Sequence, residues 1–151
     1  MGIEKDIHQL RKFKSEQHKS VVNLIFTHNW ITEKLKHYLD AEDLTLQQFN
    51  ILRILRGSDQ PLSTLQIRER MLDKMSDTSR IVDRLVLKNL AKKTISKKDK
   101  RLVDVIITAK GKNLLAILDR NTEMTDAIME NLNEAEAKLL NQLLDKIRGS
   151  V

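Results

Sequence analysis

Hydrophobic residues recur at helical spacing along most of the chain. Between Glu4 and Leu39 there is neither proline nor glycine, and apolar residues return every three or four positions. The pattern predicts one helix of about 35 residues, roughly 50 Å long, although its polar first part, up to Ser20, could form a separate turn or two. A helix of that length exceeds what a small domain needs to cover one face, so it favours packing against a second chain.

Two capping signals divide the next stretch. Thr45-Leu-Gln-Gln48 and Ser63-Thr-Leu-Gln66 each have the side chains of a capping box, so each predicts a helix start. We expect the first of these helices to end at Gly57 in a left-handed C′ position. The second is short, and its expected inner residues are Leu65, Ile67 and Met71.

A third amphipathic segment follows closely. It begins between Asp73 and Asp77, runs to about Lys88 and ends at Asn89, a residue that tolerates the left-handed conformation. Its apolar positions predict an inner face made of Thr78, Ile81, Val82 and Leu85.

The pattern then changes to alternating β-branched residues. Ala91–Ser96 and Leu102–Ile107 predict two strands, and the polar turn 97–100 between them predicts a hairpin. Thr108 caps a helix reaching toward Asn131, and Asn133-Glu-Ala-Glu136 caps the last helix. The order of elements indicates a mainly α chain with a small β-hairpin: a winged helix-turn-helix at about 44–108, flanked by long N- and C-terminal dimerisation helices at about 4–40 and 109–149. We expect one domain over residues 1–151.

Composition narrows the class of protein. The chain has 40% hydrophobic residues, only 3% aromatic residues and no cysteine, which favours helices and excludes disulfides, a thiolate nucleophile and cysteine-bound zinc. No apolar run approaches the roughly 20 residues of a membrane helix, and the N-terminus has no apolar signal region. We expect a cytoplasmic protein without a membrane partner.

The predicted hairpin concentrates positive charge. Between Lys92 and Arg101 stand six lysines and arginines against one acidic residue, Asp99, within a chain of net charge +6. Lysines and arginines that neutralise phosphates release counterions, so such a ribbon is suited to a polyanion. The alternative is an ordinary solvated hairpin whose lysines protect its edge from pairing. Its position directly after a helix-turn-helix pattern favours nucleic acid.

The third helix carries polar residues opposite its apolar side. Short hydroxyls in its first turn would let the backbone approach DNA, and Arg80 could reach guanine acceptors or a phosphate. The alternative is a surface helix whose Arg80 pairs with Asp77 or Asp83 one turn away. The polar positions are Ser76, Ser79, Arg80 and Asp83, flanked by Lys74, Arg84 and Lys88.

No catalytic motif is present, so we expect neither an enzyme nor a cofactor or metal. The chain has no phosphate-binding glycine loop, no paired zinc histidines and no nucleophile elbow. The four histidines are nine or ten residues apart, and solvated or packed histidines are the simpler interpretation. Phe26, Trp30 and Tyr38 could line an effector pocket, although aromatic residues at helical spacing belong to the core in most proteins.

Over nearly its full length the chain resembles the MarR family of bacterial winged-helix regulators. The wing signature stands here as Asp99-Lys-Arg101, an aliphatic strand and Thr108-Ala-Lys-Gly111, and the segment 79–85 resembles the recognition-helix core. In two places the chain departs from the pattern. Asn89 replaces a common glycine, and Lys74 and Met75 open the recognition helix atypically, so no base preference is carried over.

The resemblance implies a homodimer that binds a pseudo-palindromic operator in double-stranded DNA. It further implies a transcriptional regulator, typically a repressor released by a small aromatic or phenolic ligand. Arg101 would enter the minor groove at the wing tip, held by Asp99. The implied DNA contacts are Lys74, Ser76, Thr78, Ser79, Arg80 and Arg84 of the recognition helix, Lys97, Lys98, Asp99, Lys100 and Arg101 of the wing, and Ser63, Thr64 and Gln66 of the preceding helix. The alternative is a winged-helix module that binds a protein and has no specific operator.

Overall fold

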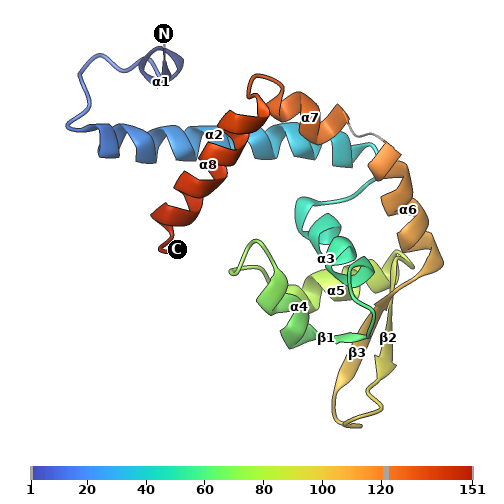
Figure 1. Cartoon of the computed structure of the whole chain (residues 1–151). Coiled ribbons are helices and arrows are strands. Elements are labelled where there is room, and N and C mark those ends of the chain that lie inside the picture. Colours follow the sequence, from blue (N-terminus) through green and yellow to red (C-terminus); the bar gives the residue numbers. More distant parts are fainter. Residues whose placement is uncertain (1, 121–122, 151) are drawn as a thin grey trace.

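The computed structural model describes residues 2–120 and 123–150. In chain order its elements are α1 (Ile3–Asp6), α2 (Glu16–Asp40), α3 (Leu46–Arg56), β1 (Leu62–Ser63), α4 (Thr64–Arg70), α5 (Thr78–Leu87), β2 (Ala91–Ile95), β3 (Val103–Ile107), α6 (Ala109–Arg120), α7 (Glu123–Met129) and α8 (Glu134–Ile147). Helices α3, α4 and α5 group on one side of α2, and the β2–β3 hairpin projects from that group, away from α2 (Figure 1). The predicted fold class, a winged helix-turn-helix flanked by terminal helices, is confirmed.

The helix starts follow from local side-chain chemistry. Thr45, Ser63 and Asn133 each accept a hydrogen bond from the backbone N–H three residues later, and the residue at that position reaches back to the cap backbone. All three predicted capping boxes are therefore confirmed. Each satisfies two backbone donors that a helix start otherwise leaves without partners.

A small antiparallel sheet holds the hairpin against the helices. The strand order is β1-β3-β2, with Ala91 opposite Ile107 and Leu62 opposite Val105. The two hairpin strands agree with the prediction to within a residue. The sequence pattern does not predict β1, because a strand of two residues carries no periodicity and exists only through its pairing with β3.

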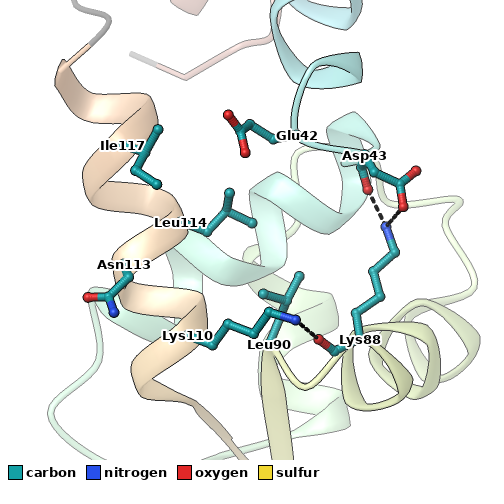
Figure 2. A pocket seen from close by; sticks show the side chains of 8 residues that line it. All are labelled: Glu42, Asp43, Lys88, Leu90, Lys110, Asn113, Leu114 and Ile117. Carbon is teal, nitrogen blue, oxygen red and sulfur yellow. Dashed lines mark hydrogen bonds and ion pairs between the residues drawn. The ribbon is translucent and has the colours of Figure 1, made fainter.

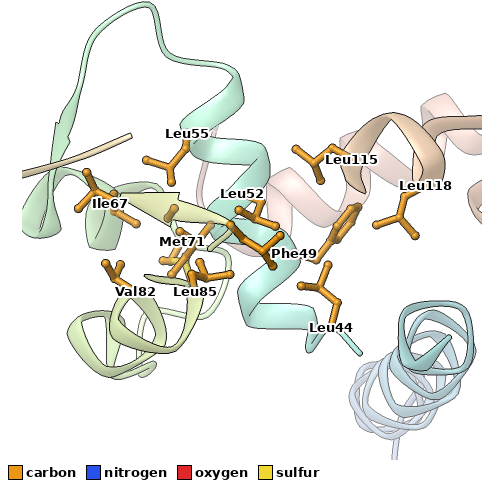
Figure 3. Close-up of a cluster of buried hydrophobic side chains, with 14 of the residues drawn as sticks. Leu44, Phe49, Leu52, Leu55, Ile67, Met71, Val82, Leu85, Leu115 and Leu118 are labelled. Atoms are coloured by element: carbon orange, nitrogen blue, oxygen red, sulfur yellow. The ribbon is translucent and has the colours of Figure 1, made fainter. Parts of the chain in front are cut away.

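The core lies where α3, α4, α5, the sheet and α6 meet. Leu52, Ile67, Val82, Leu85 and Leu115 are completely buried there, as part of one cluster (Figure 3). Burying side chains of this size contributes about 1.5–3 kcal/mol each. The cluster fixes the angle between α4 and α5, and therefore the surface that the two helices present.

Helix α5, the β2–β3 wing and α6 are joined at one junction. Thr108 donates its backbone N–H to the carbonyl of Leu90 at 3.1 Å and its hydroxyl to the carbonyl of Asn89 at 2.7 Å. Gly111 donates to the same hydroxyl and lies so close to Leu90 that a Cβ at position 111 would stand 2.4 Å from that carbonyl. Asn89 has a φ of 59°, the left-handed conformation expected from the sequence.

The predicted N-terminal helix of about 35 residues is wrong as a single element. Helix α1 ends at Asp6, and α2 begins after Ser15, which caps it by accepting from the backbone N–H of His18 at 3.1 Å. The alternative of a separate first turn is confirmed. The buried Ile3 and the Glu4–Lys19 ion pair at 2.7 Å hold α1 against the start of α2. That pair lowers the pKa of Glu4 and raises the pKa of Lys19.

The predicted helix from Thr108 toward Asn131 consists of two helices. Helix α6 ends at Arg120 and α7 begins at Glu123, whereas 121–122, within the predicted span, lie outside the described residues. Helix α7 packs against α2, and α8 buries none of its residues within the chain. In the part of the chain that the structure describes, no helix is long and apolar enough to cross a membrane.

Two residues differ from their predicted conformation or burial. Gly57 ends α3 with φ −77° and ψ 0°, so the expected left-handed position is wrong. Leu65 is 63% exposed, whereas Ile67 and Met71 are buried as expected. The reason is helical geometry, because Leu65 lies two positions before Ile67 and so points about 200° away from the buried face.

Candidate nucleic-acid interface

Helix α5 presents a polar outer face. Asp77 caps it by accepting from the backbone N–H of Arg80 at 3.3 Å, and the buried Val82 and Leu85 fix its inner side. The opposite side exposes Ser79, Arg80, Asp83 and Arg84. Arg80 is 3.8 Å from the carboxylate of Asp77, and both side chains are largely exposed. Such a pair contributes little, so Arg80 can exchange it for a stronger acceptor.

Three of the predicted recognition-helix residues lie elsewhere than expected. Lys74 and Ser76 belong to the segment before α5, in which Asp73 accepts from the backbone N–H of Met75 at 2.9 Å. Thr78 is only 4% exposed, because it lies on the inner face of α5 with Val82 and Leu85, and this placement corrects its assignment to the DNA-facing surface. Among the described residues, the hydroxyls of Ser76 and Thr78 are the buried side-chain oxygens without a hydrogen-bond partner.

The wing tip holds Arg101 in a defined orientation. The carboxylate of Asp99 accepts from the backbone N–H of Arg101 at 3.0 Å, from its Nε at 3.1 Å and from its Nη2 at 3.1 Å. These bonds lower the pKa of Asp99. Although it is gripped in this way, the Arg101 side chain is 88% exposed. Since a guanidinium has five N–H donors, three remain directed away from Asp99.

The rest of the tip is built around Ser96. Its buried hydroxyl accepts from the backbone N–H groups of Lys98 and Asp99 at 3.3 and 3.4 Å, and its own N–H donates to the carbonyl of Leu102. This inward network leaves Lys97, Lys98 and Lys100 exposed beside Arg101. The structure therefore brings the five predicted wing residues together at one projecting end (Figure 1).

Two of the three DNA contacts predicted at α4, Ser63 and Gln66, are engaged in the capping box of that helix. Ser63 accepts from the backbone N–H of Gln66 at 3.2 Å, and the Gln66 side chain accepts from the N–H of Ser63 at 2.9 Å. Thr64 instead lines a hollow between α4 and the segment leading into α5. Of the three residues predicted on α4, Thr64 is the one placed beside α5.

Two lysines have roles that sequence reasoning missed. Lys93 of β2 forms an ion pair with Asp83 of α5, which connects the wing to the recognition helix. Lys88 donates to the carbonyl of Asp43 and, at 3.2 Å, to the side chain of Gln48, so it points toward the loop before α3 rather than toward the outer face (Figure 2). The sequence gives no signal for either interaction, because each joins residues that come together only when the elements pack.

The predicted effector residues lie along α2. Phe26 and Trp30 are 40% and 41% exposed, so neither belongs to the core, whereas Tyr38 is half-buried and packs against it. A hollow of about 390 Å³ lies between the loop after α2, the end of α5 and α6 (Figure 2). None of the three aromatic residues lines it; its walls are Glu42, Asp43, Lys88, Leu90, Lys110, Asn113, Leu114 and Ile117.

The fold and this surface define a winged helix-turn-helix protein with additional terminal helices, and solved structures share that whole arrangement. A mutant of E. coli MarR complexed with operator DNA matches with a TM-score of 0.80 at 22% identity, over 91% of this chain and 99% of that one. BpsR of Bordetella bronchiseptica, whose DNA binding is regulated by 6-hydroxynicotinic acid, matches with a TM-score of 0.77 at 22% identity, over 91% and 97%. A MarR-like transcription regulator from Bacillus cereus matches with 0.79 at 17% identity, over 90% and 98%.

The chain therefore has the fold of the MarR-family regulators, as its sequence resemblance implied. No protein-family model matches the chain, and the comparison with curated proteins finds no match.

Proposed function

We propose that the protein is a sequence-specific, double-stranded DNA-binding transcriptional regulator. The observation that carries the proposal is Arg101, which is 88% exposed at the tip of a basic wing and held there by three hydrogen bonds to Asp99. Orienting a cation in advance at a projecting tip is useful when it enters a narrow, electronegative minor groove. The match to an operator-bound MarR structure supports the same assignment.

The active unit is a homodimer. Leu139, Leu143 and Ile147 recur on one side of α8 and are 53%, 49% and 65% exposed. Helix α2 likewise exposes Val21 and Ile25, and its one buried residue is Leu39. Apolar stripes on two long terminal helices that find no cover within the chain are suited to a second copy, and two-fold proteins bind two-fold operators.

The regulator acts as a repressor that a small aromatic acid releases. Regulation of BpsR by 6-hydroxynicotinic acid supports this step, as do the half-exposed Phe26 and Trp30 on α2. Trp30 is the single tryptophan of the chain, so its fluorescence reports on this surface. Titration with 6-hydroxynicotinic acid should change that fluorescence and weaken operator binding over the same concentration range. A ligand that releases DNA without affecting Trp30 would place the effector site elsewhere.

The deciding experiment is fluorescence anisotropy with the DNA upstream of the gene and a scrambled duplex, across a salt series. A preference of about 10³ or more for the upstream DNA is the expected result, because specific regulators fall in that range. Equal affinities that decrease together with salt would indicate phosphate attraction alone. That outcome would favour the alternative, a winged-helix module that binds another protein.

A further inference from the structure

Two large apolar side chains are exposed beside the polar outer face of α5. Leu65 of α4 is 63% exposed and Met75, in the segment before α5, is 92% exposed. Both line one open hollow of about 390 Å³ between the first turn of α4 and the start of α5. The other lining residues are Thr64, Arg68, Ser76, Asp77, Thr78 and Ser79.

Folding does not account for these two positions. The core face of α4 is formed by Ile67 and Met71, and Leu65 points away from it. Met75 is held outward because Asp73 accepts its backbone N–H at 2.9 Å and accepts that of Ser76 through its carbonyl at 3.4 Å. What distinguishes the two from other exposed apolar residues is that they line one hollow together, so a partner seated there would bury both and recover hydration free energy.

The surroundings of the pair indicate the chemistry of that partner. Arg68 lines the same hollow, and Arg80 and Arg84 stand on the adjoining outer face of α5. Asp77 also lines the hollow, but the three arginines outnumber it, so the surroundings favour a ligand that is anionic overall and offers a small apolar group. DNA meets both conditions, because the C5-methyl group of thymine is the apolar group that base edges present in the major groove.

We propose that Leu65 and Met75 together receive a thymine C5-methyl group in each operator half-site, which makes them specificity-determining residues. The inference rests on the proposed function and deepens it. Cytosine has hydrogen at the same ring position, so the apolar pair favours thymine there. Ser76 and Ser79 line the same hollow and so border the position that the methyl group would occupy.

The test removes the methyl group without changing any hydrogen bond. A duplex selected from a random library for tight binding is synthesised again with uracil in place of thymine, and dissociation constants are compared. Burying one methyl group is worth about a fourfold change in affinity, so two half-sites give roughly a 15-fold loss for the wild-type protein. Replacing thymines one position at a time should concentrate the loss at one base pair per half-site.

A double variant, Leu65→Ala with Met75→Ala, tests whether these two side chains are the ones that sense the methyl group. It should bind the thymine duplex about 15-fold more weakly than the wild-type protein and respond to uracil by less than about twofold, because the receiving surface is gone. Leu72→Ala is the matched control. Leu72 is 86% exposed in the same segment but does not line the hollow, so its variant should keep the full uracil effect. All three residues are exposed, so thermal unfolding should be unchanged.

Two results would overturn the inference while leaving the proposed function intact. One is a wild-type protein that binds both selected duplexes equally. The other is a double variant that keeps the wild-type uracil effect, which would assign the pair to a different occupant, such as a protein partner. A selection that yields no duplex preferred over scrambled DNA would instead refute the proposed function, and the inference with it.

Discussion

At the scale of single residues, Arg101 is the position at which DNA binding should be most sensitive. Arg101→Ala removes a side chain that is oriented but 88% exposed, so it should leave folding intact. We expect operator binding to weaken by roughly 1–3 kcal/mol, the usual size of one groove contact. Anisotropy with the operator duplex measures this loss, and Lys92→Ala, an exposed residue of β2, serves as the control for lost charge. Equal losses for the two variants would show that Arg101 contributes only charge.

Asp99 should affect the preference for the operator rather than the general affinity for DNA. Asp99→Asn keeps an oxygen that can accept from the Arg101 backbone but loses the two-oxygen grip on its guanidinium. Affinity for scrambled DNA should rise because a negative charge is removed, whereas the preference for the operator should fall. The ratio of the two dissociation constants measures this effect. A preference that stays constant or rises would separate Asp99 from the positioning of Arg101.

The lowered pKa of Asp99 sets the pH range over which its carboxylate holds Arg101. A depressed carboxyl pKa stabilises the folded wing above the unfolded value of about 3.9 and loses this effect as pH falls through the folded value. Asp99 therefore stays ionised from about pH 5 to 8. Any change of operator affinity in that range must come from other groups.

Two glycines should respond in opposite ways to alanine. A Cβ at Gly111 would stand 2.4 Å from the Leu90 carbonyl and 2.7 Å from Cγ1 of Ile107, so Gly111→Ala must displace the junction. We expect a loss of about 2–4 kcal/mol in the free energy of unfolding, in the range of overpacked cores and strained backbone. Gly57 has an ordinary helical φ, and a Cβ there would make only van der Waals contact with the carbonyls of Arg53 and Ile54, at 3.4 and 3.8 Å, so Gly57→Ala should stabilise by about 0.4–1 kcal/mol. Urea unfolding measures both free energies of unfolding. A shift of the two variants in the same direction would contradict this account.

At the scale of elements, Lys88 connects the end of α5 to the loop before α3. Lys88→Met keeps the aliphatic stem but leaves the carbonyl of Asp43 and the side chain of Gln48 without their lysine donor. The free energy of unfolding should fall by about 1–2 kcal/mol, the cost of losing hydrogen bonds to a charged group. Urea unfolding measures the midpoint, and Lys92→Met is the exposed control. A midpoint unchanged from the control would mean that the connection is broken in solution.

The elements differ in how far sequence alone predicts them. The capping boxes at Thr45, Ser63 and Asn133 and the turn at Asn89 depend on neighbours within a few residues, so local chemistry suffices to predict them. The break between Asp6 and Glu16 depends on Ile3 and Glu4 packing back onto α2, which no periodicity reports. The apolar character of Leu65 predicts an inward side chain, but its angular position on a helix of seven residues points it outward.

In the candidate site, too, the contacts between near neighbours in sequence are predictable and those between elements are not. The wing signature places Asp99 and Arg101 correctly because the tip is built from contacts two or three residues apart. By contrast, the pairing of Lys93 with Asp83 joins positions ten residues apart on different elements. Contacts of this kind appear only once α5 and β2 are packed together.

At the scale of the whole molecule, dimerisation should depend on α8. Leu143→Glu places a charge in the middle of the exposed apolar stripe without disturbing the core of one chain, since α8 buries no residue within it. We expect the variant to be a folded monomer of 17.5 kDa and the wild-type protein to have twice that mass. Light scattering at micromolar concentration measures the difference. Operator affinity should fall with it, because the two half-sites would then bind separate chains.

Lys138→Glu provides the matched control, because it introduces the same side chain on the opposite, exposed side of α8. It should remain a dimer. A wild-type protein that is already monomeric at micromolar concentration would exclude the proposed assembly, whatever the two variants do.

The junction of Leu90, Thr108 and Gly111 also determines where the chain can change its length. A residue inserted in the tip turn 97–100 would leave the paired strands in register and would disturb only the hydrogen bonds of the tip itself, those to Ser96 and Asp99. A residue inserted between Ile107 and Gly111 would rotate the start of α6 by about 100° and separate Thr108 from Asn89. A change of length at the tip therefore stays local to the tip, whereas a change at the junction alters the angle between the wing and α6.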